Sequence, residues 1–334
     1  MKRRIGEQTL IFTNEPVILH TATVAGSKEG AGKLGGYFDV VLTDNIDGCA
    51  SWEQCESKMM EQAVRTAVLK SGRNIDDIDC VLAGDLLNQL MSTHFAMRTV
   101  GRPFLGLYGA CSTMAESMLV GSMMVDGGYC DTVACCASSH HEAAERQYRF
   151  PTELGVQRPP IAQWTVTGAG SAVIGKAVYG PRVTTGTIGK VVDYGIKDTN
   201  ALGAAMAPAA VDTLRQHFAD TGRTPAYYDK IYTGDLGAIG REIVLRMMRE
   251  DGIELSGVYD DCGCMIYLEN QDAHAGASGC ASSALVFCGY LFKQMLKQKL
   301  SKVLLLGTGS LHSPTSYQQK ESIPCISHAV SIEL

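Results

Sequence analysis

The sequence has few charged residues and no concentration of one charge. Asp, Glu, Lys and Arg make up 19% of the 334 residues, and the formal net charge is −6. An average domain is about a quarter charged. No run of five like charges occurs along the chain. Proteins that bind nucleic acids carry a basic patch or stripe, so we exclude a nucleic-acid partner.

Long apolar runs are also missing. The basic residues within 1–4 are followed by a stretch, 5–10, that contains Gly, Glu and Gln, so no signal-peptide core follows. The longest weakly polar stretch, 276–292, contains Ser and Gly and ends at Lys293. It falls short of the roughly 20 apolar residues of a spanning helix. We therefore expect no transmembrane segment, and contact with a membrane only from outside the lipid.

Zinc-binding patterns are missing although the chain has 12 cysteines. Without a secretory signal, this number favours a reducing compartment, where cysteine acts mainly as a small apolar residue. The pairs Cys135-Cys136 and Cys262-x-Cys264 lack the spacing and the neighbouring histidines of a zinc site. We predict no metal site and no cofactor.

The sequence does contain 46% hydrophobic residues and 36 glycines, the composition of a globular protein with many tight turns. At roughly 150 residues per domain, the length fits two domains or one large fold of two halves. Helical and strand patterns alternate, which is typical of a parallel sheet covered by helices. The predicted elements are a helix from Ser51 to Gly72, a strand over 78–83, a helix that begins after Cys111 and runs to Gly127-Gly128, and a strand over 132–137.

An internal repeat relates the two halves of the chain. Three segments of the first half recur in the second in the same order, the first about 150 residues later and the other two about 170 residues later. The matching pairs are 78–86 with 228–236, 109–112 with 278–281, and 132–137 with 302–307. Near-constant spacing predicts a duplicated α/β unit, and we divide the chain into halves at 1–178 and 179–334.

A duplicated α/β half with a cysteine opening its third helix resembles the thiolase and ketosynthase superfamily. Within it, the sequence resembles the stage V sporulation protein AD family from about residue 5 onward. The segments that carry this resemblance are 82–89, 104–113, 144–153, 205–210 and 318–326. The resemblance implies an α/β, thiolase-like five-layered αβαβα fold made of two pseudo-symmetric halves. It also implies a homodimer formed at the edge strand 103–108, unless other subunits cover that edge.

Cys111 is the first candidate for the site. A thiol at a helix N-terminus feels the positive end of the helix dipole, which predicts a lowered pKa and a nucleophilic thiolate. In the superfamily that cysteine carries the acyl group. The alternative is a buried cysteine that acts only as a small apolar residue. From its place between Gly109-Ala110 and a helix, we expect Cys111 to line a pocket.

The histidine and asparagine side chains that make such a cysteine catalytic in the superfamily are absent from the corresponding positions of this chain. Ketosynthases have a His after the strand equivalent to 229–233 and an Asn at the position of Cys280, whereas this chain has Asp235 and a cysteine. At the position of the thiolase histidine this chain has Ala273, and His274 follows one residue later. His274 is either a displaced general base or a loop residue without a catalytic role. A condensing reaction needs a proton shuttle and an oxyanion hole. We interpret the condensing machinery as dismantled.

Cationic and aromatic groups follow the strand over 132–137, where ligands bind in open α/β sheets. His140, Arg146 and Arg149 could hold a carboxylate, because a guanidinium offers a planar fork of donors. Alternatively, these arginines pair with acidic residues as a structural network. The acidic residues in question are Glu142, Glu145 and Glu153.

Four further residues have two interpretations each. His312 follows the last core strand and could border the pocket. Asp85 and Asp235 end equivalent strands, so they either cap the helices that follow or face a central cavity. Glu116, one turn into the Cys111 helix, either faces the thiol or is exposed or structurally paired.

The family resemblance implies the ligand and the setting. The ligand would be dipicolinic acid (pyridine-2,6-dicarboxylate) or its calcium chelate, bound without catalysis. The protein would act in loading the spore core with dipicolinate and in its release at germination. It would lie in the spore or forespore, peripheral to the inner membrane, alongside membrane proteins of the same operon. We predict the ligand-binding residues to be Cys111, His140, Arg146, Arg149, Cys280 and His312.

Two other functions stay open from the sequence. One is an active thiolase or ketosynthase-type acyltransferase with Cys111 as nucleophile. The other is a structural subunit whose pocket is vestigial.

Overall fold

Two half-sheets of identical strand order form the centre of the molecule. The computed structural model describes residues 3–148 and 158–334. The first half-sheet has the order β3-β9-β7-β5-β6 and the second the order β10-β15-β14-β11-β12. Its strands are β3 (Val17–Ala25), β5 (Cys80–Gly84), β6 (Phe104–Gly106), β7 (Thr132–Ser139) and β9 (Gly168–Gly175). Those of the second are β10 (Arg182–Thr187), β11 (Lys230–Thr233), β12 (Tyr259–Asp261), β14 (Lys302–Ser310) and β15 (Cys325–Glu333).

The strand pairing has the same pattern of directions in both halves. The β5 pairs with β6 and β7 and the β11 pairs with β12 and β14 are parallel, whereas β9 and β15 run antiparallel to their neighbours. A single antiparallel contact of Arg182 with Val17 joins β10 to β3, so the two half-sheets form one continuous sheet. The remaining short strands are β1 (Arg4–Ile5), β2 (Thr9–Ile11), β4 (Val40–Val41), β8 (Trp164–Thr165) and β13 (Ala277–Ser278).

The sequence repeat corresponds to this duplication. Strand β5 matches β11 and strand β7 matches β14, each in the same place within its half-sheet. The helices α4 (Thr113–Gly127) and α8 (Cys280–Leu285) both begin at or just after the matched segments 109–112 and 278–281. The predicted pseudo-symmetry is confirmed. The division of the chain at residue 178 stays a prediction from the repeat; it falls in the connection from β9 to β10.

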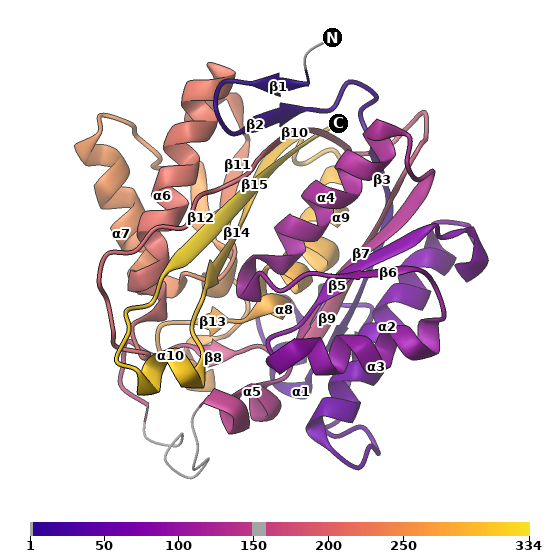
Figure 1. The fold of residues 1–334 in the computed structure, drawn as a ribbon, viewed down its shortest axis with the longest axis horizontal. Helices are drawn as coiled ribbons and strands as arrows, with labels where there is room; N and C mark the ends of the chain where they lie inside the picture. Colours follow the sequence, from indigo (N-terminus) through magenta and orange to yellow (C-terminus); the bar gives the residue numbers. More distant parts are fainter. Residues whose placement is uncertain (1–2, 149–157) are drawn as a thin grey trace.

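Helices cover and separate the half-sheets in five layers (Figure 1). The outer helices α2 (Trp52–Lys70) and α3 (Met91–Val100) lie against the first half-sheet, and α6 (Leu202–Thr221) and α7 (Gly237–Glu250) lie against the second. Between the half-sheets lie α4, α8 and α9 (Phe292–Leu296), with a π-helical turn over Val286–Leu291. The short helices are α1 (Ser27–Gly30), α5 (His141–Tyr148) and α10 (Pro314–Gln318).

Local signals placed the boundaries of two helices correctly. The hydroxyl oxygen of Ser51 accepts a hydrogen bond from the amide of Gln54 at 3.2 Å and caps α2. Helix α4 ends at Gly127 and is capped by Gly128, whose φ of 77° is in the left-handed region that glycine adopts without strain. Most of α4 is buried because it packs against both half-sheets, which explains the low charge of this segment.

The fold brings the ends of four strands to one place. The carboxyl ends of β5, β7, β11 and β14 lie near the starts of the central helices, where open α/β sheets bind ligands (Figure 1). Within the described residues, none of the helices has the length and apolar character that crossing a bilayer requires.

Candidate functional site

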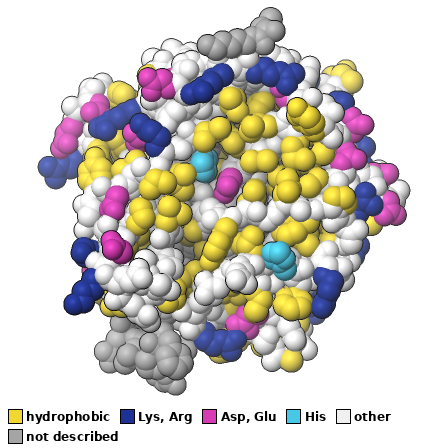
Figure 2. Space-filling view, viewed as in Figure 1, with side chains coloured by type: hydrophobic (Ala, Val, Ile, Leu, Met, Phe, Trp, Pro, Cys, Tyr) yellow, Lys and Arg dark blue, Asp and Glu magenta, His cyan; other side chains and the backbone are white. Residues whose placement is uncertain are grey.

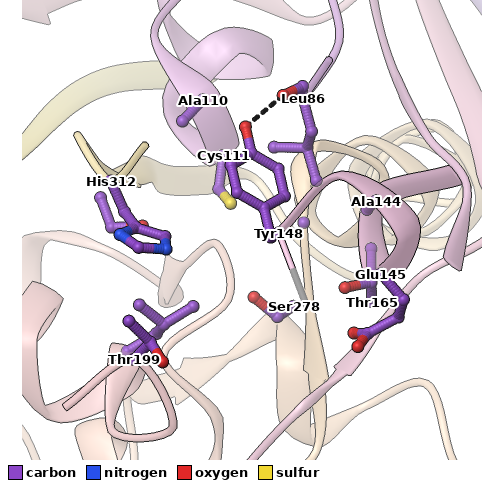
Figure 3. A pocket seen from close by; sticks show the side chains of 13 residues that line it. Leu86, Ala110, Cys111, Ala144, Glu145, Tyr148, Thr165, Thr199, Ser278 and His312 are labelled. Atoms are coloured by element: carbon purple, nitrogen blue, oxygen red, sulfur yellow. Dashed lines mark hydrogen bonds between the residues drawn. The ribbon is translucent and has the colours of Figure 1, made fainter. Parts of the chain in front are cut away.

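A pocket opens at the junction of the two halves (Figure 3). Its empty space is about 620 Å³, part of which is open to solvent. Cys111 lies in its wall between groups from both halves. The lining residues are Leu86, Ala110, Cys111, Ala144, Glu145, Tyr148, Thr165, Thr199, Leu202, Ser278, Gly279, Ser310 and His312.

The turn that carries Cys111 is tightly held. Residues Ala110–Ser112 form a 3₁₀ turn that leads into α4, and Ala110 has φ 51°, a left-handed conformation unusual for alanine. The Ala110 carbonyl accepts hydrogen bonds from the Thr113 hydroxyl at 2.6 Å and from the Cys280 thiol at 2.9 Å. These contacts fix Cys111 at the pocket wall, where its side chain is nearly buried.

The backbone of the second half packs directly against this turn. A Cβ built on Gly309 would lie 2.2 Å from the Gly109 carbonyl oxygen. A side chain at residue 309 would therefore collide with the loop before Cys111. The glycine allows β14 to approach the Cys111 turn, and so joins the two halves at the pocket.

The Cys111 thiol faces a carboxylate. Burial raises its pKa well above the usual value, and the negative charge of Asp235 and the neighbouring Cys280 raise it further. The expectation of a lowered pKa is therefore wrong, because burial and a close negative charge outweigh the helix dipole.

Asp235 is the centre of a buried hydrogen-bond network. Its carboxylate accepts bonds from the Ser278 hydroxyl at 3.0 Å, the Gly279 amide at 3.0 Å and the Thr308 hydroxyl at 2.8 Å. Burial raises the pKa of Asp235, while the donors around it, the Cys111 thiol first, act in the opposite direction. A carboxylate is thus the group that the chain places after β11.

The two symmetry-related acids have different roles. Asp85 accepts hydrogen bonds from the amides of Leu87 and Thr93, both at 2.7 Å, and so caps the start of α3 as expected. Asp235 does not cap the helix after it, because the amides of Leu236 and Gly237 donate to Asp261. Of the two interpretations, capping holds for Asp85, and proximity to the central cavity holds for Asp235.

The structure brings three of the six predicted residues to this place. Cys111 and His312 line the pocket, and Cys280 lies behind the wall in contact with the Ala110 carbonyl. His312 follows β14 and its ring lies 5.7 Å, between centroids, from that of Tyr148. The interpretation in which His312 borders the pocket agrees with this placement.

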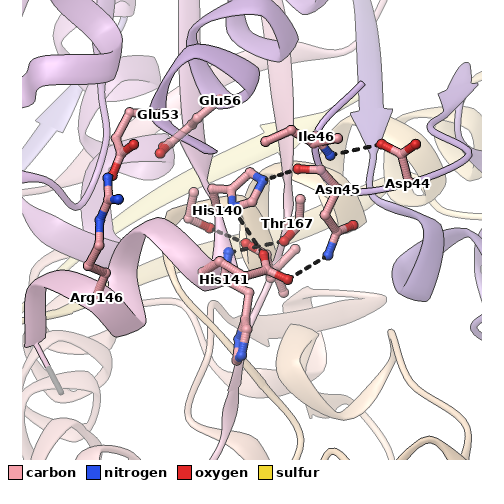
Figure 4. A network of polar contacts seen from close by, with 12 residues as sticks. Asp44, Asn45, Ile46, Glu53, Glu56, His140, His141, Arg146 and Thr167 are labelled. Atoms are coloured by element: carbon pink, nitrogen blue, oxygen red, sulfur yellow. Dashed lines mark hydrogen bonds and ion pairs between the residues drawn. The ribbon is translucent and has the colours of Figure 1, made fainter. Parts of the chain in front are cut away.

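His140 and Arg146 are not among the residues that line the pocket, and Figure 4 shows the polar contacts that hold them. The His140 ring is buried, with Nε2 2.7 Å from the Asn45 carbonyl oxygen and Nδ1 3.2 Å from Glu142. Arg146 pairs with Glu53 on α2. The structural interpretation of Arg146 therefore fits its position, although its partner is not one of the acids expected.

The charge of Glu142 is set by this same network. Burial alone would raise its pKa, but hydrogen bonds from His140 and Asn45 lower it to about 2. The third predicted cation, Arg149, and the acid Glu153 lie outside the described residues.

Two further candidates, His274 and Glu116, are not among the residues that line the pocket. His274 Nε2 lies 3.2 Å from the Asp272 carboxylate, and His274 is absent from the pocket lining given above. Glu116 is also absent from the residues that line the pocket. Its Oε2 atom is buried beside Gly109. Burial raises the pKa of Glu116. Among residues 3–148 and 158–334, no three His, Cys, Asp or Glu side chains are grouped so as to hold a metal ion.

The sequence argument missed the pocket residues Tyr148, Glu145 and Ser278. The first two lie on α5, one turn apart on the face opposite Arg146, so helical spacing from Ala144 could have indicated them. Ser278 lies within the repeat match at 278–281, which pointed to the segment but not to the side chain.

Comparisons with known proteins agree with this architecture. The family model described as stage V sporulation protein AD (SpoVAD) matches residues 6–333. The chain belongs to this family. Stage V sporulation protein AD of Bacillus subtilis (strain 168) is 45% identical over 328 residues, which cover 98% of this chain and 97% of the relative. This protein is therefore related to a sporulation protein along almost its whole length.

Solved structures with low sequence identity share the fold. A variant of OleA of Xanthomonas campestris has a TM-score of 0.62 at 14% identity and covers 97% of this chain and 99% of its own. The 3-oxoacyl-[acyl-carrier-protein] synthase III of Aquifex aeolicus VF5 has a TM-score of 0.61 at 11% identity, covering 96% and 100%. The thiolase-like fold predicted from the sequence is confirmed.

Proposed function

We propose that this protein is a non-catalytic receptor for dipicolinic acid or its calcium chelate. It takes part in loading the developing spore with dipicolinate and in releasing it at germination. Membership of a sporulation family supports the setting. The pocket at the junction of the halves is the binding site we assign.

The observation that carries the proposal is the contact between Asp235 and Cys111. Thioester chemistry needs a thiolate and a group that accepts its proton and passes it on. Here a buried carboxylate lies near the thiol, and burial together with its negative charge raises the pKa of Cys111. A second negative charge beside Asp235 is unfavourable in a buried place. The thiol therefore stays neutral and serves as part of the wall.

Apart from the Glu145 carboxylate, the remaining wall suits a small planar acid. Leu86, Ala144 and Leu202 are apolar, and hydroxyl groups come from Thr199 and Ser310. Small-molecule sites are commonly apolar with a few placed polar groups. Hydroxyl groups and the His312 ring can donate to carboxylate oxygens.

We also propose a homodimer and peripheral attachment to the spore inner membrane through membrane proteins. Within the described residues, β6 pairs with β5 alone, so its other edge is open. Leu105 on β6 is 48% exposed and Met123 on α4 is 40% exposed. Figure 2 shows hydrophobic side chains gathered on this face of the molecule. A second copy pairing at β6 would cover them.

Titration calorimetry tests the receptor function. The purified protein should bind dipicolinate, with and without equimolar calcium, at micromolar concentrations. The variant Cys111→Ser should retain the affinity within about threefold, because a neutral hydroxyl can replace the neutral thiol in the pocket wall. Absence of binding with both forms of the ligand, by a folded protein, would refute the proposal.

A second candidate function is acyl transfer with Cys111 as nucleophile. It is favoured by the position of Cys111, which opens a buried helix at a pocket in a fold shared with 3-oxoacyl-[acyl-carrier-protein] synthase III. Intact-mass measurement after incubation with acyl-coenzyme A separates the two. An adduct that disappears in Cys111→Ala supports the enzyme. Dipicolinate binding without an adduct supports the receptor. Absence of both the adduct and the binding supports a scaffold with a vestigial pocket.

A further inference from the structure

Two aromatic rings from distant parts of the chain meet in the pocket wall. Tyr148 ends α5 in the first half, and His312 follows β14 in the second. Their ring centroids lie 5.7 Å apart with an interplanar angle of 34°. Tyr317 on α10 meets His312 edge-on at 6.3 Å and 86°, and its side chain is 60% exposed. A row of three rings therefore leads from the surface to the pocket.

The Tyr148 ring is held in one orientation. Its hydroxyl donates to the Leu86 carbonyl oxygen, in the loop after β5 (Figure 3). Because the proton of the hydroxyl is used there, the group of Tyr148 that borders the empty space is mainly the ring. Burial and the neighbouring Tyr108 raise the pKa of Tyr148, so the hydroxyl stays neutral and the bond to Leu86 is kept.

One other wall group also directs its proton to the protein. The Ser278 hydroxyl donates to Asp235 and is therefore not aimed into the empty space. On this side of the pocket, the ring faces of Tyr148 and His312 are what a ligand can contact. This side can therefore select a ligand by its aromatic ring.

We infer that Tyr148 and His312 form a ring platform on which a planar aromatic acid stacks, and that this platform selects aromatic over aliphatic dicarboxylates. The inference rests on the proposed receptor function and extends it to a residue, Tyr148, that selects the ligand class. Aromatic pairs prefer offset or tilted stacking with centroids about 4.5–7 Å apart, and such contacts add to the burial of apolar area. Loss of one ring should weaken an aromatic ligand by about tenfold.

The test uses three diacids and calorimetry. The probes are pyridine-2,6-dicarboxylate, benzene-1,3-dicarboxylate and glutarate, an aliphatic acid with a similar span between its carboxylates. Tyr148→Leu should weaken both aromatic acids about tenfold and leave glutarate unchanged. Tyr148→Phe keeps the ring and should stay within about threefold of wild type. Tyr129→Leu, which alters an 84% exposed ring at the far end of α4, is the matched control and should change nothing.

A second variant keeps the inference testable if Tyr148→Leu does not fold. His312→Gln retains hydrogen-bonding capacity but removes the ring, so it should cost the aromatic acids affinity and spare glutarate. Equal losses for all three acids, no loss for the aromatic ones, or wild-type binding of glutarate as tight as that of benzene-1,3-dicarboxylate would overturn the inference.

The two proposals fail in different ways. Wild-type binding of benzene-1,3-dicarboxylate without pyridine-2,6-dicarboxylate would remove the receptor function and leave the ring platform. Binding of pyridine-2,6-dicarboxylate that Tyr148→Leu does not weaken would remove the platform alone. A wild-type protein that binds neither aromatic acid would overturn both.

Discussion

Asp235→Asn should make Cys111 reactive without changing the shape of the pocket wall. The substitution removes the negative charge that faces the thiol and leaves the buried position unchanged. Two unit charges about 4 Å apart, roughly the reach of an S–H···O bond, interact by about 4 kcal/mol at an effective dielectric constant of 20. Relaxation reduces this figure, and we expect the pKa of Cys111 to fall in the variant because the negative charge beside the thiol is gone.

The change in rate is smaller than the change in pKa suggests. A lower pKa raises the thiolate fraction, while the intrinsic nucleophilicity of the thiolate falls and offsets part of the gain. We therefore expect alkylation of Cys111 by iodoacetamide at pH 8 to be about tenfold faster than in wild type. Peptide mapping by mass spectrometry distinguishes Cys111 from the 11 other cysteines, because the chain has 12 in all.

The pseudo-symmetry of the fold supplies the control. Asp85→Asn removes the equivalent acid of the first half, which caps α3. Both variants leave a buried donor without its acceptor and should lose about 1–3 kcal/mol of stability. Only Asp235→Asn should change the alkylation rate. A folded Asp235→Asn variant that reacts at the wild-type rate would refute the argument that this carboxylate keeps the thiol neutral.

Three other substitutions test the placement of residues. Arg146→Ala removes the pair with Glu53 and should lower the melting temperature while calorimetry finds dipicolinate affinity unchanged; weaker binding with an unchanged melting temperature would contradict this. Gly309→Ala puts a Cβ 2.2 Å from the Gly109 carbonyl, so it should reduce both stability and binding by forcing the Cys111 turn aside. Burial lowers the pKa of His217 to about 3, so only the unfolded chain binds a proton there between pH 6.5 and pH 3. The free energy of unfolding should therefore fall as the pH drops through this range, by about 2 kcal/mol at pH 5 relative to its value above pH 6.5. Urea titrations should find that slope reduced in His217→Gln.

The fold was accessible from the sequence because its signals are local or repeated. The cap at Ser51 and the glycine at the end of α4 are set by neighbours within a few positions. The halves were visible because duplication keeps related strands at constant spacing. Duplication also predicts that the two half-sheets share one strand order, as they do in the structure.

The site was accessible only in part, because its chemistry depends on contacts between distant residues. Asp235 meets the Ser278 hydroxyl 43 positions away and the Thr308 hydroxyl 73 positions away. Its equivalence to Asp85 suggested a cap, and nothing in the local pattern separates the two acids. Arg146 finds Glu53 at a separation of 93 positions, whereas the acids considered from the sequence were its near neighbours.

The pocket belongs to both halves, and this bears on what a ligand does to the protein. Cys111 and Tyr148 come from the first half, and Ser278 and His312 from the second. A ligand that touches both sides binds the packed arrangement and not the separated halves, so it stabilises their contact. At 100 times its dissociation constant a ligand adds about 2.7 kcal/mol to the free energy of unfolding. Because the Gly309 backbone already lies against the Cys111 turn, the same contact that positions the thiol also transmits this stabilisation between the halves.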